Sequence, residues 1–256
     1  MPRHVAVIAR YTLLEAWRSG FFWLLLALVA LQFGVALFLS HVSITESAEI
    51  RRTVVAAGAR LSAVFILAVF AVFSTAREFH ERGIDYVLAL PVSRAAYLLG
   101  RGAGLAICGA IVAAAFAACA ASLGGGVASA FWGLSLALEV WLVTAFALFC
   151  VITLAQPVSA LVACGGFYIL ARSINTFLLI AASSTVGDPS WSDRLADWVI
   201  RGIALIVPRM DHFTRTEWLL AGSPTAPEIA ACAVQTCVYV LLITAAALFD
   251  LYRREF

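Results

Sequence analysis

The sequence predicts an all-α membrane protein in which six helices cross a lipid bilayer. Of its 256 residues, 63% are hydrophobic and only 12% are charged, and the mean hydropathy is +0.99. A soluble domain is about half apolar and about a quarter charged, so this excess of apolar side chains requires lipid as the solvent. The apolar residues also gather in runs of about 20, the length that a helix needs to cross the hydrocarbon core.

The elements follow one another within a single transmembrane domain that occupies residues 1–256. We expect a short helix on the membrane surface over residues 1–20, because Trp17 and Arg18 are typical anchors at the headgroup level and Ser19-Gly20 allows a bend. A frayed extension of the first span is the alternative. The predicted spans are Phe21–Leu39, Thr53–Thr75, Ala95–Leu123, Ser129–Ala155, Val158–Ala182 and Glu228–Phe249.

The connections between these spans have recognisable signals. The polar run His41–Arg52 predicts a loop after the first span. Gly124-Gly125-Gly126 predicts a tight turn, since glycine adopts positive φ without steric cost. Gln156-Pro157 predicts the end of the fourth span, because proline cannot continue a helix and restricts the residue before it.

A long polar segment, residues 183–227, precedes the last span and contains an amphipathic helix. Its start is marked by the capping box Ser190-x-x-Asp193, and Pro208 ends it. We expect this helix to lie along the outer membrane surface or to cover the spans. Its apolar face consists of Leu195, Trp198, Val199, Gly202 and Ile206, and its polar face of Arg194, Asp197 and Arg201.

The arginines predict the orientation of the chain. With the N-terminus inside, nine arginines fall in inner segments and seven in outer ones. Four of the seven lie in the segment 183–227, and long translocated segments count little toward the positive-inside bias. The ratio without those four is nine to three, so we expect a multi-pass protein of the inner (plasma) membrane with both termini in the cytoplasm.

Arg60 lies about two turns into the second predicted span, and two further ionisable residues interrupt the apolar runs, Glu139 in the fourth predicted span and Arg172 in the fifth. An ionised group at the bilayer centre costs roughly 2.5–3.5 kcal/mol on insertion scales, so it usually faces protein or water and has a partner. Glu139 and Arg172 each lie about ten residues, or roughly 15 Å, from the outer end of their span, which is the right depth for a pair. The pair either lines a translocation path or fixes helix packing.

Residue patterns typical of catalysis are absent from the sequence. Because the chain has no lysine, it cannot contain the Gly-x-x-x-x-Gly-Lys loop that binds ATP. The six cysteines all lie in apolar runs without a CxxC pair, so we expect them to fill helix interfaces as small hydrophobic residues. We predict no catalytic residue, metal or cofactor, and the net charge of +2 predicts no nucleic-acid partner.

The most charged connection lies on the predicted inner side, between the second and third spans. Residues 77–101 read REFHERGIDYVLALPVSRAAYLLGR. Gly83 breaks the helix that leaves the second span, the apolar run Tyr86–Leu90 is too short to cross a bilayer, and Pro91 ends it. The pattern predicts a short helix at the membrane surface, which either docks with a partner or lies on lipid.

The third span begins just after this proline. Ser93 is placed to cap its first turn, and we expect Arg94 and Arg101 to anchor it at the inner interface. Gly100 and Gly104 form a GxxxG pattern, which permits close contact with another helix.

Three runs within residues 77–101 also carry a family resemblance. They are Glu81-Arg82-Gly83, Leu90-Pro91-Val92-Ser93-Arg94 and Tyr97-Leu98-Leu99-Gly100-Arg101. Together they resemble the signature that surrounds the cytoplasmic coupling helix of ABC-2 type transporter permeases. The order of elements over nearly the whole chain is similar too: an N-terminal elbow helix, six spans, an external segment before the sixth span, and a basic tail. The subgroup that it most resembles is the short six-span permease associated with multicopper-enzyme maturation.

The resemblance implies a non-catalytic permease subunit of an ATP-binding cassette exporter. Separate ATPase subunits would bind ATP, and the permease would pair with a second copy of itself or with another permease. The alternatives are a membrane scaffold that recruits an ATPase to a non-transport machine, and a membrane-embedded enzyme. The coupling region, residues 77–94, would contact the ATPase around Glu78, Glu81, Arg82, Gly83, Asp85, Pro91 and Arg94.

Overall fold

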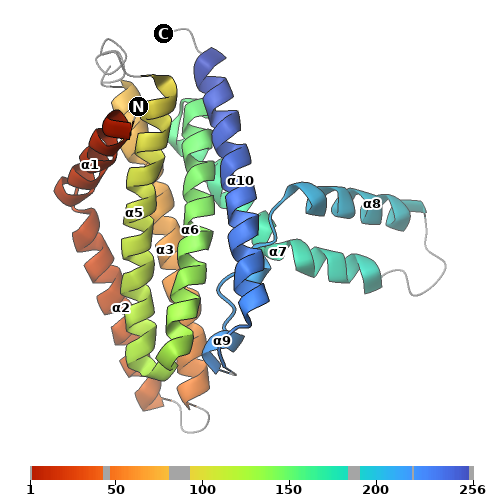
Figure 1. Ribbon diagram of the computed structural model, residues 1–256. Helices are drawn as coiled ribbons and strands as arrows, with labels where there is room; N and C mark the ends of the chain where they lie inside the picture. The colour runs from red at the N-terminus through yellow and green to blue at the C-terminus, as the bar shows by residue number, and fades with distance from the viewer. Residues whose placement is uncertain (1, 43–46, 81–92, 184–190, 221, 254–256) are drawn as a thin grey trace.

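The computed structural model describes residues 2–42, 47–80, 93–183, 191–220 and 222–253, which are almost entirely helical (Figure 1). Six helices in this part of the chain are long and apolar enough to cross a membrane, which confirms the predicted number. They are α2 (Phe21–Val42), α3 (Ser47–His80), α5 (Arg94–Ala120), α6 (Gly126–Leu154), α7 (Pro157–Ser183) and α10 (Ala226–Arg253). The shorter elements are α1 (Pro2–Arg18), α8 (Trp191–Ile206), α9 (Glu217–Leu220), the π-helical turn η1 (Ala121–Gly125) and the 3₁₀ turn η2 (Met210–His212).

Helix α6 forms the centre of the bundle. It packs against α3, α5, α7 and α10, and most of its residues are buried. Trp132, Leu136 and Val140 on its core face are completely inaccessible. Helices α2 and α10 flank this core and leave most of their apolar side chains exposed, as expected where lipid surrounds the bundle.

The chain turns at both places that the glycine and proline patterns predict. Between α5 and α6, Gly124 has a φ of +91°, which glycine adopts without strain. The Arg52 guanidinium lies against this glycine and donates a hydrogen bond of 3.3 Å to the Leu123 carbonyl. Between α6 and α7, Ala155 has a φ of +57° and Pro157 is the first residue of the next helix.

The connection between the first two spans is shorter than its polar composition suggests. Residues 41–52 were expected to form a loop, but α2 extends to Val42 and α3 begins at Ser47. Helix α3 has 34 residues. At helical rise it is about 51 Å long, whereas the hydrocarbon core is only about 30 Å thick. Charged residues such as Arg51 therefore fit in its first turns, outside the apolar region.

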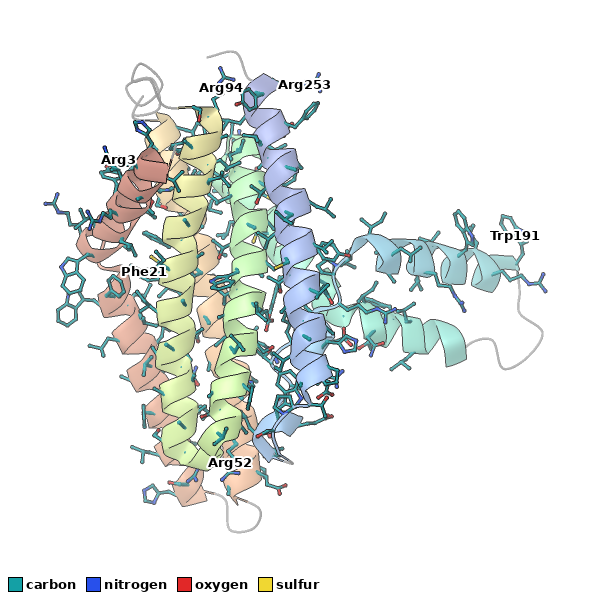
Figure 2. All side chains as sticks on the ribbon, viewed as in Figure 1. Arg3, Phe21, Arg52, Arg94, Trp191 and Arg253 are labelled. Atoms are coloured by element: carbon teal, nitrogen blue, oxygen red, sulfur yellow. The ribbon has the colours of Figure 1, made fainter. Side chains whose placement is uncertain are left out.

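Helices α7 and α8 form a hairpin that projects from the side of the bundle (Figure 1). Trp191, the first residue of α8, lies at the end of the hairpin far from the bundle (Figure 2). The amphipathic pattern correctly predicts this helix, and it ends at Ile206, just before Pro208. Its main packing partner is α7, so it does not cover the ends of the spans.

Helix α1 crosses the beginning of α5 at the two glycines of the GxxxG pattern. A methyl group added to Gly104 would meet Thr12 Cβ at 2.6 Å, and one added to Gly100 would meet Ile8 Cβ at 2.8 Å. Both distances are shorter than carbon atoms tolerate, so only glycine allows this approach. The N-terminal helix is thereby held against the bundle.

Replacing Gly104 with alanine is therefore expected to destabilise the packing of α1 on α5. The added methyl group overpacks the crossing, which typically costs about 1–3 kcal/mol. Thermal unfolding of the purified chain in detergent measures this loss. The matched control is Gly102→Ala, since the nearest atom to an added Cβ there is Leu148 Cδ1 at 4.0 Å. An equal melting temperature for the two variants would contradict the close crossing.

Candidate functional site

The predicted coupling region is described only at its two ends. Glu81, Arg82, Gly83, Asp85 and Pro91 lie outside the described residues. Glu78 is in the last turn of α3, and Arg94 is the first residue of α5. The Ser93 side chain accepts a hydrogen bond of 3.2 Å from the Ala96 backbone N–H, which confirms that it caps α5.

The end of α3 and the start of α5 are joined by a buried ion network around Arg101. Its Nη1 atom donates to Glu15 Oε2 on α1 at 2.7 Å and to Glu78 Oε1 on α3 at 3.2 Å. It also donates to Thr12 Oγ1 at 3.3 Å, and the Tyr97 hydroxyl donates to the second carboxylate oxygen of Glu78. One guanidinium thus connects three helices, and both of its acidic partners are mostly buried.

The position of Arg101 differs from the expected anchor at the inner interface. Its side chain is only 1% exposed. The reason is the glycine crossing: α1 lies over Gly100 and Gly104 and covers the arginine between them. Glu15 was not predicted as the partner of Arg101 from the sequence. A lone carboxylate among the apolar residues of α1 was the available signal.

Arg94 joins the start of α5 to the end of α10, the last helix, at the same end of the bundle. Its Nη1 atom donates to the Leu251 carbonyl at 2.6 Å and to the Tyr252 carbonyl at 3.2 Å, in the last turn of α10. A guanidinium at a helix C-terminus satisfies free carbonyl groups and complements the helix dipole. Nearby, the Thr153 hydroxyl of α6 donates to Asp250 Oδ2 of α10 at 2.6 Å. Five helices, α1, α3, α5, α6 and α10, are therefore tied together at this end.

A second polar cluster lies inside the bundle, where the structure brings Glu139 and Arg172 together. Arg172 Nη1 is 3.5 Å from Glu139 Oε1, and the glutamate is completely buried. The Tyr168 hydroxyl donates to Glu139 Oε1 at 3.0 Å, and the Thr214 hydroxyl donates to Oε2 at 2.7 Å. Each oxygen of this buried carboxylate therefore has a donor, as a buried charge requires.

The segment after α8 completes the cluster, and the sequence analysis did not predict its role. Arg172 Nη1 donates to the Met210 carbonyl at 2.6 Å and to the Phe213 carbonyl at 3.1 Å. The Thr214 backbone N–H donates to Ser135 Oγ at 3.0 Å, and this threonine has a φ of +46°. Positive φ is unusual for a β-branched residue, so the surrounding contacts hold it there.

The Glu139–Arg172 pair is covered by protein at its carboxylate, which is completely buried, whereas the Arg172 side chain is 24% exposed. It links α6, α7 and η2 and fixes the path of the chain between α8 and α10. The complete burial of Glu139 agrees with the packing role, and both the packing role and the path-lining role of the pair stay predictions.

Comparison with known proteins gives no family assignment. Neither a protein-family model nor a curated protein sequence matches this chain.

Proposed function

We propose that this chain is the permease subunit of an ABC-2 type ATP-binding cassette exporter. The observation that carries the proposal is the Arg101 network. It binds Glu78, at one end of the charged stretch 77–101, to the beginning of α5 at the other end. A segment whose two ends are held rigidly in the bundle is suited to transmit a movement of a bound partner to several spans at once.

The partner would be a separate ATPase subunit, because the sequence contains no ATP-binding loop of its own. The ATPase would dock under the coupling region and bind ATP, with no catalysis on this chain. Two permease subunits would pair, so that closure of two ATPase subunits moves both coupling regions together. Motion applied there would reach α1 and α3 through Arg101, and α10 through Arg94.

The cytoplasmic side would be the end of the bundle at which α1 begins and α10 ends. Arg3, Arg94 and Arg253 lie at this end, and Arg52 lies at the opposite end (Figure 2). The excess of arginines near the termini agrees with the positive-inside rule. In this orientation α1 would be the elbow helix at the inner surface, whereas α8 projects from the side of the bundle between its two ends (Figure 1).

Co-purification with an ATPase tests the proposal. The tagged chain, expressed in its own host and extracted with mild detergent, is expected to retain a P-loop ATPase in equimolar amount. The double variant Glu81→Ala/Arg82→Ala is expected to lose most of it, because it removes the charges proposed to meet the ATPase.

The matched control is Glu49→Ala/Arg51→Ala, which removes the same two charges from the opposite end of α3. This control is expected to retain the ATPase at the wild-type level. The proposal fails if the wild-type chain retains no P-loop ATPase, or if the two double variants retain it equally.

A further inference from the structure

A groove of about 520 Å³ runs between α3 and α7 on the flank of the bundle. Its volume lies within the range of roughly 300–1,000 Å³ that small-ligand sites occupy. The walls are mostly apolar, and Leu61, Phe65 and Ile169 on its rim are each more than half exposed. The groove therefore opens sideways, toward the lipid that surrounds the spans.

Two arginines lie near one end of this groove, and one of them is paired with Glu139. Tyr168 lines the groove, and Arg172 lies one helical turn beyond it on α7. On α3, Arg60 lies one turn before Val64, which lines the opposite wall. Both guanidinium groups lie within electrostatic range of the Tyr168 hydroxyl. Arg60 and Arg172 therefore each lie within one helical turn of a residue that lines the groove, one on each wall, and Glu139 compensates the charge of Arg172.

The two arginines, Arg60 and Arg172, differ in their hydrogen-bond and ion-pair partners. Arg172 pairs with Glu139 and donates to backbone carbonyl groups, and Asp211 lies within range of it on the side of η2. Arg60 makes no hydrogen bond or ion pair with any described residue, and its Nε atom is buried. Glu139 already has three partners. Among the described residues, no anion therefore pairs with Arg60, which lies near a groove that is open to lipid.

We propose that this groove binds an anionic amphiphile, with its acidic group at Arg60 and its apolar chain between α3 and α7. An acid at Arg60 satisfies a cation that is costly within the membrane. The chain then extends from Arg60 along Leu61, Val64 and Ala68. A lipid with an anionic headgroup and a free fatty acid share this chemistry. This binding site is inferred from the groove and from Arg60, and it does not depend on an ATPase partner.

Two neighbouring glycines allow the chain-binding part of the groove to be tested separately from the charge. Gly165 lines the groove, whereas Gly166 does not. A Cβ atom added at either position meets nothing within 4 Å, so both tolerate a larger side chain. Gly165→Leu fills the groove, and Gly166→Leu is the matched control. Arg60→Gln removes the cation and leaves the groove open.

Native mass spectrometry of the detergent-purified chain measures binding of three probes: dioleoyl phosphatidylglycerol, dioleoyl phosphatidylcholine and sodium oleate. The wild-type chain is expected to bind one phosphatidylglycerol about tenfold more tightly than phosphatidylcholine, as a charge-assisted contact implies. Arg60→Gln is expected to abolish this preference, and Gly165→Leu to lose the bound molecule, while Gly166→Leu behaves as wild type. The monodisperse elution of each variant verifies its fold.

The three probes also identify the source of the ligand. If only the binding of oleate depends on Arg60 and Gly165, the ligand is a free amphiphile. If the binding of phosphatidylglycerol depends on these residues, the ligand is a lipid. Equal affinity of the wild-type chain for the anionic probes and for phosphatidylcholine would overturn the proposal. So would unchanged binding of the anionic probes in Arg60→Gln, or identical binding by the two glycine variants.

Discussion

Replacing Arg101 with methionine is expected to destabilise the folded chain by about 3 kcal/mol, at the lower end of the roughly 3–5 kcal/mol typical of breaking a buried ion pair. Methionine fills a similar volume but leaves Glu15 and Glu78 as mostly buried carboxylates without their cation. The lower end applies because these glutamates keep 15% and 20% of their side-chain surface exposed. Equilibrium unfolding in mixed micelles measures the loss.

Two further variants separate the loss of charge pairing from a general effect of the substitution. Arg10→Met removes an exposed arginine from α1 and is expected to change stability by no more than about 0.5 kcal/mol. Adding Glu15→Gln and Glu78→Gln to Arg101→Met is expected to restore part of the stability, since no uncompensated carboxylate remains. An Arg101→Met variant as stable as Arg10→Met would contradict the network. So would a triple variant that is no more stable than Arg101→Met.

Replacing Glu139 with alanine is expected to cost about 3–5 kcal/mol, because it leaves a partly buried cation and two buried hydroxyl groups without their acceptor. The groups affected are Arg172, Tyr168 and Thr214. Glu139→Gln keeps an acceptor oxygen and is expected to lose less, about 1–3 kcal/mol. The exposed Glu217→Ala serves as the control and is expected to be nearly neutral.

Amide hydrogen exchange of the Glu139 variants distinguishes a local loss of packing from a general loss of stability. Because Thr214 and Arg172 hold η2 against α6 and α7, residues 208–215 are expected to exchange their amide hydrogens faster in Glu139→Ala. The first turns of α5, around Arg101, are expected to keep their wild-type exchange rate. Uniform acceleration over the whole chain, or none in residues 208–215, would contradict the role assigned to this cluster.

The spans and most of their breaks could be predicted because they depend on local sequence. Apolar runs of sufficient length define helices that cross a membrane, and Gly124 and Pro157 end helices through their own backbone geometry. The Glu139–Arg172 contact could be predicted as well, since two opposite charges at equal depth in an apolar medium favour a pair.

The features that the sequence analysis missed depend on contacts between distant segments. Arg101 reads as an interfacial anchor until α1 is known to cross at Gly100 and Gly104 and to bring Glu15 over it. The role of Thr214 depends on Ser135 and Glu139, more than 70 residues away in the chain. The polar run before Thr53 reads as a loop because local composition does not show that α3 extends beyond the bilayer.

The rate of ATP hydrolysis by the complex in lipid nanodiscs tests the proposed coupling most directly. The ATPase is assembled with wild-type chain, with Glu81→Ala/Arg82→Ala, and with the control Glu49→Ala/Arg51→Ala. The proposed coupling predicts that the first double variant lowers the rate by about fivefold or more, as expected when a coupling of at least about 1 kcal/mol is lost, while the control matches wild type. Equal rates for the two double variants would contradict it.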